Sequence, residues 1–584
     1  MSDAHFLITE NMDIWTTAIK KRSSQGRGSN KKIELTGIKK LRELIFELAV
    51  RGKLVSQESC DEPASELLER LTNKKSLIAK SGKFSELKTK EALKLDGLFE
   101  IPSTWKWCHL NDIAAIARGG SPRPIKSFIT DSEDGLNWIK IGDSTRGSRY
   151  ITETEQKIIK EGLVKTRQVY PGDLILSNSM SFGFPYILKI SGCIHDGWLL
   201  LRTPENDLNK IFLCNLFMST YAKKAFTNAA SGAVVQNLNA DKVKLLAIPL
   251  PPLAEQHRIV AKVDELMALC DQLEQQTEDS ITAHQTLVET LLATLSNSES
   301  PAAFNQNWTR IAEHFDTLFT TEHSIDQLKQ TVLQLAVMGK LVPQDPSDEP
   351  ASELLERLTE KKSLIAKAGK FSELNTKNAL KLDHLFEIPS SWKWCHLDDI
   401  AAIARGGSPR PIKSFITDSE DGLNWIKIGD STRGSRYITE TEQKIIKEGL
   451  VKTRQVYPGD LILSNSMSFG FPYILKITGC IHDGWLVLRT PEDDLNKIFL
   501  CNLFMSTYAK NAFSDAASGA VVQNLNADKV KLLAIPLPPL EEQHRIVKKV
   551  DELLTLCDQL KSRLSEAQTT QLHLANTLVK QAVN

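Results

Sequence analysis

Two short loops rich in arginine and glycine carry residue types that can contact nucleic acid. ARGGSPRPIK, residues 117–126, has three basic side chains and no acid, and GDSTRGSR, residues 142–149, has two arginines beside serine and threonine hydroxyls. Arginine can grip guanine or phosphate with two hydrogen bonds, and serine can bond either base edges or phosphate. The glycines would let the backbone approach a ligand closely. The loops therefore predict contact with DNA, although ordinary solvated loops have the same composition.

Both loops occur twice in the chain, so each candidate residue has an equivalent in a second copy. The candidates for DNA contact in the first copy are Arg118, Ser121, Arg123, Lys126, Lys140, Ser144, Arg146, Arg149, Ser177 and Asn178. Those in the second copy are Arg405, Ser408, Arg410, Lys413, Lys427, Ser431, Arg433, Arg436, Ser464 and Asn465. For Ser177, hydrogen bonding at the end of a strand is the alternative role.

Motifs for catalysis are missing from the sequence. There is no GxxxxGK[ST] phosphate loop, no GxSxG nucleophile motif, no HExxH and no Rossmann glycine pattern. The Asn/Asp-Pro-Pro-aromatic signature of amino-methyltransferases is also missing. Cys193-Ile-His195-Asp196 resembles half of a metal site, but no second pair of ligands accompanies it, so a packed cysteine and a surface histidine are expected. We predict a non-catalytic chain with no metal or cofactor of its own.

The candidate loops belong to a long internal repeat. Adding 287 to a residue number maps the first half of the 584-residue chain onto the second, and residues 112–190 reappear unchanged at 399–477. Between residues 61 and 260 there are roughly 14 differences, and a repeat of this length is a duplicated domain rather than a solenoid unit.

Helical patterns flank each copy. After Pro251-Pro252 a long pattern begins with apolar residues at alternating steps of four and three, which predicts a seam that packs on another helix. The seam residues are Ile259, Val263, Leu266, Cys270, Leu273, Ile546, Val550, Leu553, Cys557 and Leu560. Further helices are predicted from Gly37 and Ser324, and after Asp61, which could cap a helix whose first turn contains Pro63.

The interior of each copy has a different pattern. Short apolar and β-branched runs such as WIKIGD and DLILSNS, bounded by Gly, Pro, Asn and Asp, predict strands. A clear helical pattern comes only later, from Asp207. The residues therefore predict an α+β domain, present twice and mounted on helices.

The composition gives no overall attraction to nucleic acid or membrane. The chain has 72 basic and 72 acidic residues, so any DNA contact must come from local patches. The amino terminus lacks a basic start followed by an apolar run, and no stretch approaches the roughly 18 apolar residues of a membrane span, so we expect a cytoplasmic protein.

Three segments together resemble the specificity subunit of type I restriction-modification systems. LAVRGKLV, and LAVMGKLVPQDPSDEPASELLERL in the second copy, are similar to the helical region before a target-recognition domain. WKWCHLNDIAAIARGGSPRPI followed by NWIKIGD resembles the opening of that domain. SGAVVQNLNADKVKLLAIPLPPLAEQHRIV resembles its closing segment and the spacer helix that follows.

The resemblance implies a reader of double-stranded DNA that performs no chemistry. It implies two target-recognition domains joined by long antiparallel, coiled-coil-like helices with pseudo-twofold symmetry, each domain reading half of a bipartite target. Two methyltransferase subunits and restriction/translocase subunits are the implied partners, for host defence. S-adenosylmethionine, ATP and Mg are expected in those partners and not in this chain.

The expected division is an N-terminal helical region over 1–99, a first recognition domain over 100–252, a central helical spacer over 253–386, a second recognition domain over 387–539 and a C-terminal spacer helix over 540–584. Identical readers related by a dyad see the same bases on opposite strands, so we expect an interrupted palindrome. A protein-interaction scaffold that presents two identical domains is the alternative function.

Overall fold

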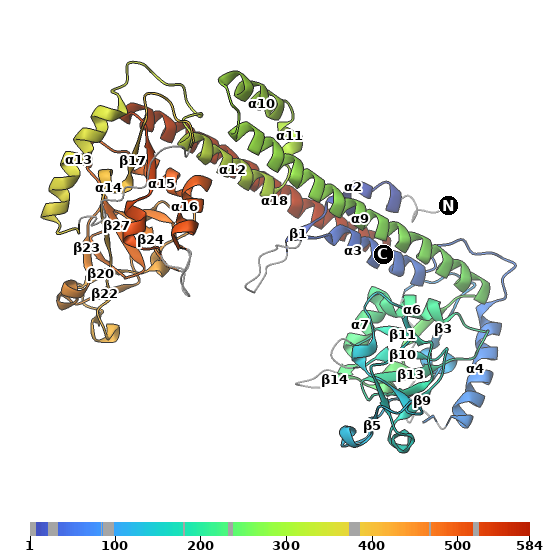
Figure 1. The fold of residues 1–584 in the computed structure, drawn as a ribbon. Helices are drawn as coiled ribbons and strands as arrows, with labels where there is room; N and C mark the ends of the chain where they lie inside the picture. Colours follow the sequence, from blue (N-terminus) through green and yellow to red (C-terminus); the bar gives the residue numbers. More distant parts are fainter. Residues whose placement is uncertain are drawn as a thin grey trace. The chain divides into compact units, whose positions relative to one another are not determined.

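The structure is a computed structural model, and it describes residues 7–21, 33–82, 84–85, 99–178, 182–231, 237–372, 386–466, 469–517 and 525–583. The chain divides into two compact units, residues 1–280 with 566–584 and residues 281–565. Each unit contains one copy of the repeat, in which helices accompany two five-stranded sheets (Figure 1). The fold is therefore two repeated α/β domains with a long helix, α9, between them in the chain.

The helices through the end of the first copy are α2 (Met12–Thr17), α3 (Thr36–Val50), α4 (Ala64–Ser81), α5 (Leu110–Ile113), α6 (Lys210–Met218), α7 (Thr220–Ala229), α8 (Ala240–Lys244) and α9 (Leu253–Ser296). The later helices are α10 (Pro301–Glu313), α11 (Phe315–Leu318), α12 (Glu322–Val337), α13 (Ala351–Ala368), α14 (Leu397–Ile400), α15 (Lys497–Met505), α16 (Thr507–Ala517), α17 (Ala527–Lys531) and α18 (Leu540–Val583). The 3-10 turns are η1 (Ile125–Ser127), η2 (Ile141–Asp143), η3 (Lys160–Lys165), η4 (Ile412–Ser414), η5 (Ile428–Asp430) and η6 (Lys447–Lys452).

The strands of the first copy form two main sheets. The first sheet has the order β4 (Ala115–Arg118), β13 (Trp198–Arg202), β10 (Leu174–Ser177), β11 (Pro185–Leu188), β7 (Tyr150–Ile151). The second has the order β5 (Ile129–Thr130), β8 (Gln156–Ile158), β6 (Leu136–Ile139), β12 (Gly192–Ile194), β9 (Arg167–Val169). The short pairs are β1 (Lys20–Lys21) with β2 (Ile33–Glu34), β3 (Lys106–His109) with β16 (Ala247–Leu250), and β14 (Ala230–Ser231) with β15 (Asn237–Leu238).

The second copy repeats this topology. Its first sheet has the order β18 (Ala402–Arg405), β27 (Trp485–Arg489), β24 (Leu461–Ser464), β25 (Pro472–Leu475), β21 (Tyr437–Ile438). Its second sheet has the order β19 (Ile416–Thr417), β22 (Gln443–Ile445), β20 (Leu423–Ile426), β26 (Gly479–Ile481), β23 (Arg454–Val456), and β17 (Lys393–His396) pairs with β28 (Ala534–Leu537).

The central strands are buried on both faces. Side chains of a strand alternate between its faces, so Ile462 of β24 packs between the two sheets. Leu461 and Leu463 point the other way, into a cluster that includes Phe499 and Phe504 of α15. Each domain thus consists of a helical layer, a central sheet and an outer sheet. This double burial explains why DLILS is a continuous apolar run rather than an alternating one.

Two local details differ from the sequence prediction. The helical pattern from Asp207 forms two helices, because Ser219 is extended and its Oγ accepts a hydrogen bond from the Ala222 N–H at 3.1 Å, which starts α7. Asp61 does not cap α4, whose N-cap position is occupied by Pro63. Asp61 instead accepts a hydrogen bond from Arg258 Nη2 at 2.6 Å.

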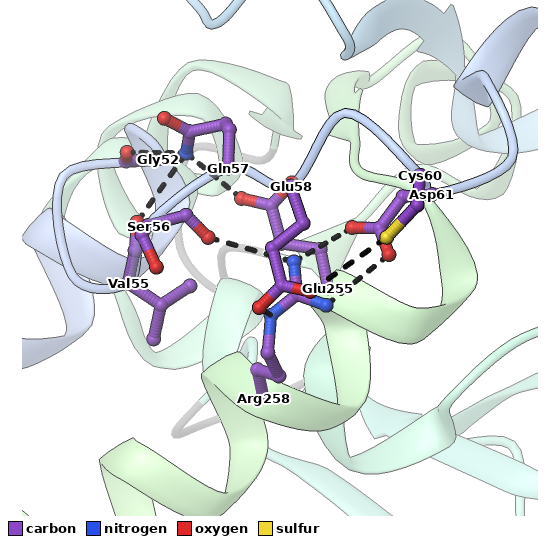
Figure 2. A network of polar contacts seen from close by, with 9 residues as sticks. All are labelled: Gly52, Val55, Ser56, Gln57, Glu58, Cys60, Asp61, Glu255 and Arg258. Carbon is purple, nitrogen blue, oxygen red and sulfur yellow. Dashed lines mark hydrogen bonds and ion pairs between the residues drawn. The ribbon is translucent and has the colours of Figure 1, made fainter.

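A polar network fixes the loop after α3 to the first turns of α9 (Figure 2). Gln57 Nε2 donates to Glu255 Oε1 at 2.9 Å, and Arg258 reaches Asp61, whose side chain is only 6% exposed. Burial raises the pKa of Glu255. The second copy repeats the two contacts through Gln344 with Glu542 at 2.9 Å and Arg545 with Asp348 at 2.7 Å. The Glu-Gln segment after the paired prolines therefore anchors the helix within its unit.

The predicted seam residues are buried or partly buried, but their partners differ along α18. Ile546 and Val550 pack in the cluster that contains Phe499 and Phe504 of α15. Cys557 packs in a cluster with Val288 of α9 and Leu328 of α12, and there the seam meets another long helix, as predicted. The buried seam residues are Ile259, Val263, Leu266, Cys270, Ile546, Val550 and Cys557, and the partly buried ones are Leu273, Leu553 and Leu560. Among the residues described, no helix combines the length and apolar character that a membrane crossing requires.

Replacing Arg258 by Leu should loosen this anchor, because the mostly buried carboxyl group of Asp61 would lose its hydrogen-bond donor. We expect a loss of about 1–3 kcal/mol of local stability. Hydrogen exchange should speed up in residues 51–61. Lys262→Ala, on an exposed part of the same helix, is the matched control, and equal acceleration in both variants would contradict the role given to Arg258.

Candidate nucleic-acid interface

The loop 117–126 meets the turn between β12 and β13 at Asp196. Arg118 Nε donates to the Asp196 backbone oxygen at 3.0 Å, and Ser121 Oγ donates to Asp196 Oδ1 at 2.9 Å. Arg123 Nη2 lies 3.7 Å from Asp196 Oδ2. In the second copy the same three distances around Asp483 are 3.0, 2.9 and 3.7 Å. The structure therefore brings three predicted residues of each copy together around one acid.

The glycines of this loop allow close packing on the chain itself. The Gly119 N–H donates to the Trp198 oxygen at 2.9 Å, and a Cβ on Gly119 would lie 2.2 Å from the His195 oxygen. A Cβ on Gly120 would lie 2.4 Å from the Lys165 oxygen. The sequence suggested that these glycines let a ligand approach the backbone closely. In the structure they instead let the loop pack on the backbone of His195 and Lys165.

His195 supports Asp196 from its other side. Its Nε2 lies 3.0 Å from Asp196 Oδ1, and its Nδ1 accepts a hydrogen bond from the Gly197 N–H at 2.9 Å. An accepting Nδ1 leaves the proton on Nε2, so the ring is neutral, and its Nε2 lies beside the carboxylate. Burial holds the pKa of His195 below its ordinary value, which agrees with a neutral ring. The half-buried histidine thus supports the turn through the hydrogen bond that it accepts from Gly197.

Ser177 and Asn178 lie inside the domain. Ser177 is 2% exposed and its Oγ accepts from the Phe184 N–H at 2.9 Å. Asn178 is fully buried, and its Nδ2 donates to the Asp196 backbone oxygen at 3.1 Å. Ser464 and Asn465 have the same burial and contacts. Side chains so enclosed offer DNA no surface, and we therefore assign these four residues to holding the strand end and the turn.

The second basic loop is tied to its surroundings at several points. Lys140 Nζ donates to Glu155 Oε2 at 2.8 Å, and Ser144 Oγ donates to the Ile141 oxygen at 2.7 Å. Arg146 lies over the ring of Phe184, 5.5 Å from its centroid. Lys427, Ser431 and Arg433 repeat these contacts with Glu442, Ile428 and Phe471.

Arg149 turns toward the long helix. Its Nη2 donates to Asp264 of α9, and this hydrogen bond raises the pKa of the guanidinium. Arg436 makes the same pair with Asp551 and also contacts Asn502 Oδ1 at 3.3 Å. These two arginines hold the loop on its helix, so a role in base contact is not supported for them.

Four cations of each copy remain at the surface as candidates for DNA contact: Arg118, Arg123, Lys126 and Arg146, with Arg405, Arg410, Lys413 and Arg433. Arg123 has 81% of its side chain exposed.

Asp196 and His195 are the site residues that sequence reasoning missed. Their signal in the sequence is the repeated Cys-Ile-His-Asp, which predicts a packed cysteine and a surface histidine but gives no role to the acid. Cys193 is fully buried, and burial raises its pKa to about 11.

Comparison with known proteins identifies relatives over the whole chain. The family described as "Type I restriction modification DNA specificity domain" matches residues 102–283 and 389–567. The chain is 37% identical to the type I restriction enzyme EcoEI specificity subunit of Escherichia coli and 35% identical to the EcoAI specificity subunit, with 99% of each chain covered in both cases. A crystal structure of the HsdS subunit from Thermoanaerobacter tengcongensis gives a TM-score of 0.42 at 20% identity, covering 84% of this chain and 98% of that one.

In the segment SGAVVQNLNADKVKLLAIPLPPLAEQHRIV, which resembles the closing part of a recognition domain, residues 232–236 lie outside the described residues.

Gly119→Ala should destabilise the first copy, because the new methyl group would collide with the His195 oxygen. Overpacking of this kind costs about 1–3 kcal/mol. Gly142→Ala is the matched control, since a Cβ there meets nothing within 4 Å. Thermal unfolding should show a lowered midpoint for the first variant only. Equal midpoints would mean that the loop can move away without cost.

Proposed function

The chain belongs to the family of type I restriction-modification DNA specificity subunits, and from this we propose that its two recognition domains read the two halves of one bipartite DNA target. As a specificity subunit it is the non-catalytic member of a complex with methyltransferase and restriction subunits. We further propose two methyltransferase subunits per chain, with the chain positioning them and the restriction/translocase subunits at the target. S-adenosylmethionine, ATP and Mg then belong to those partners.

The observation that carries the proposal is that the two copies agree in sequence and in geometry. Residues 112–190 and 399–477 are identical, and the contacts around Asp196 and Asp483 have the same lengths. Two identical surfaces must read the same bases. If they meet DNA through an approximate dyad, the target is a half-site, an unread spacer and the reverse complement of the half-site.

The long helices are suited to setting the spacer. α9 and α18 have 44 residues each, and an α-helix rises about 1.5 Å per residue, so their length does not depend on the DNA sequence. The net charge of zero is consistent with a DNA reader whose partner subunits supply part of the sequence-independent binding to phosphate.

Methylome sequencing tests the symmetry of the target. In cells that carry this chain with its methyltransferase subunits and lack other adenine methylation, we expect one interrupted palindrome, because both domains present the same residues. A methylated motif with unrelated halves would contradict the proposal. A scaffold without a role in DNA binding would give no motif, and the complex would then show no duplex binding that weakens as salt rises.

Arg123 and Arg410 have 81% and 83% of their side chains exposed, so their joint replacement by Ala should relax or abolish recognition while the complex still assembles. Arg→Lys at both positions separates two roles, because lysine keeps the charge but lacks the planar fork. If the lysine variant recognises the target as the unsubstituted chain does, the arginines contact phosphate. If it fails like the alanine variant, they read bases. Lys242→Ala with Lys529→Ala, at exposed lysines of α8 and α17, is the control for loss of one positive charge in each copy. Site choice in the methylome that matches the unsubstituted chain would remove both arginines from the interface.

A further inference from the structure

Asp196 stands out because it is an acid at the centre of a basic surface. On a surface that faces DNA, a carboxylate repels phosphate, so general binding does not explain it. A carboxylate can instead accept a hydrogen bond from an exocyclic amino group, such as N4 of cytosine, in the major groove. The same acid recurs as Asp483, with the same neighbours.

The two oxygens of Asp196 have different surroundings. Oδ1 accepts a hydrogen bond from Ser121 Oγ at 2.9 Å and lies 3.0 Å from His195 Nε2, so its position is held by the serine and by the neighbouring ring. Oδ2 faces Arg123 Nη2 at 3.7 Å, beyond hydrogen-bonding distance. Within the described parts of the chain, this arginine is the partner that Oδ2 faces, and the oxygen therefore keeps capacity to accept.

The distance between Asp196 Oδ2 and Arg123 Nη2 is long compared with that of a structural ion pair in the same domain. Arg202 Nη2 lies 2.6 Å from Asp173 Oδ2, and that acid is only 7% exposed. Asp196 is 30% exposed and Arg123 is 81% exposed. The short Arg202–Asp173 pair stabilises the fold. The longer Arg123–Asp196 pair leaves a guanidinium donor and a carboxylate acceptor side by side at the surface.

We infer that Asp196 and Asp483 are specificity-determining residues, each accepting a hydrogen bond through Oδ2 from the exocyclic amino group of one cytosine or adenine in its half-site. Arg123 and Arg410 beside them supply donors for a neighbouring acceptor, such as guanine O6 or N7. The inference rests on the proposed function and adds the chemical group that each domain recognises.

Substitution by Asn tests this directly, since Asn keeps an acceptor for Ser121 but replaces Oδ2 by an amide donor. Asp196→Asn in the complete complex should change preference at a single base pair of one half-site, from an amino-bearing base toward a base with a carbonyl acceptor. Discrimination at that position should fall roughly 5- to 150-fold. Asp483→Asn should do the same to the other half-site, and the untouched copy is the internal control in each case.

Glu161→Gln, on an exposed part of the same domain, is the matched control for loss of an acidic charge and should leave the methylome motif unchanged. An unchanged motif in the Asp196→Asn complex would overturn the inference. So would an equal loss of discrimination at every position of the half-site, which is the result expected if Asp196 only orders the loop.

The main arm of a second measurement uses the unsubstituted complex and so does not depend on how the variant folds. The unsubstituted complex is bound to duplexes in which single cytosines or adenines of one half-site lack their exocyclic amino group. We expect weakened binding at one position, by the same 5- to 150-fold, and no further weakening there with Asp196→Asn. Equal binding to all these duplexes would overturn the inference alone. The absence of any sequence-specific methylation by the unsubstituted complex would overturn the proposed function as well.

Discussion

The cluster of charged side chains around Asp196 depends on one close approach, that of the Gly119 backbone to the His195 carbonyl oxygen, and Gly406 approaches His482 in the same way in the second copy. Because glycine has no Cβ, the arginine loop can pack directly on the turn between β12 and β13. Only then can Ser121 reach Asp196, and only then do Arg118 and Arg123 lie beside the same acid. Exposed ion pairs contribute roughly 0–1 kcal/mol, too little to arrange such a cluster by themselves. Backbone packing sets the places of the charges, and the charges are then available for a ligand.

Much of the architecture could be predicted from the sequence because it depends on long-range regularities. The repeat, the long helix after Pro251-Pro252 and the strands bounded by turn residues all follow from periodicity and from proline and glycine chemistry. The interruption at Ser219 did not follow, since a serine inside a helical pattern is compatible with a continuous helix and its capping role depends on the tertiary fold.

The candidate site was less predictable, because residue type does not show which way a side chain turns. Ser177 and Asn178 follow an apolar strand and could equally lie at a surface, yet both are enclosed by the turn that they support. Arg149 has the same chemistry as Arg123, but its partner Asp264 lies 115 residues away in the chain. Asp196 lies 73 residues from Arg123 in the chain, so the sequence pattern, which suggests half of a metal site, does not show that the acid lies beside the arginine loop.

The letter-for-letter repeat has a consequence for how such a protein can change its target. Each copy is encoded separately but folds within its own unit, so a mutation in one codon alters one surface and leaves the other intact. Under the proposed function, the unaltered copy would still bind its half of the old target, while the altered copy would bind a different half-site. Duplication thus gives this reader a route to new specificities by small steps, and recombination between the copies gives a route back to symmetry.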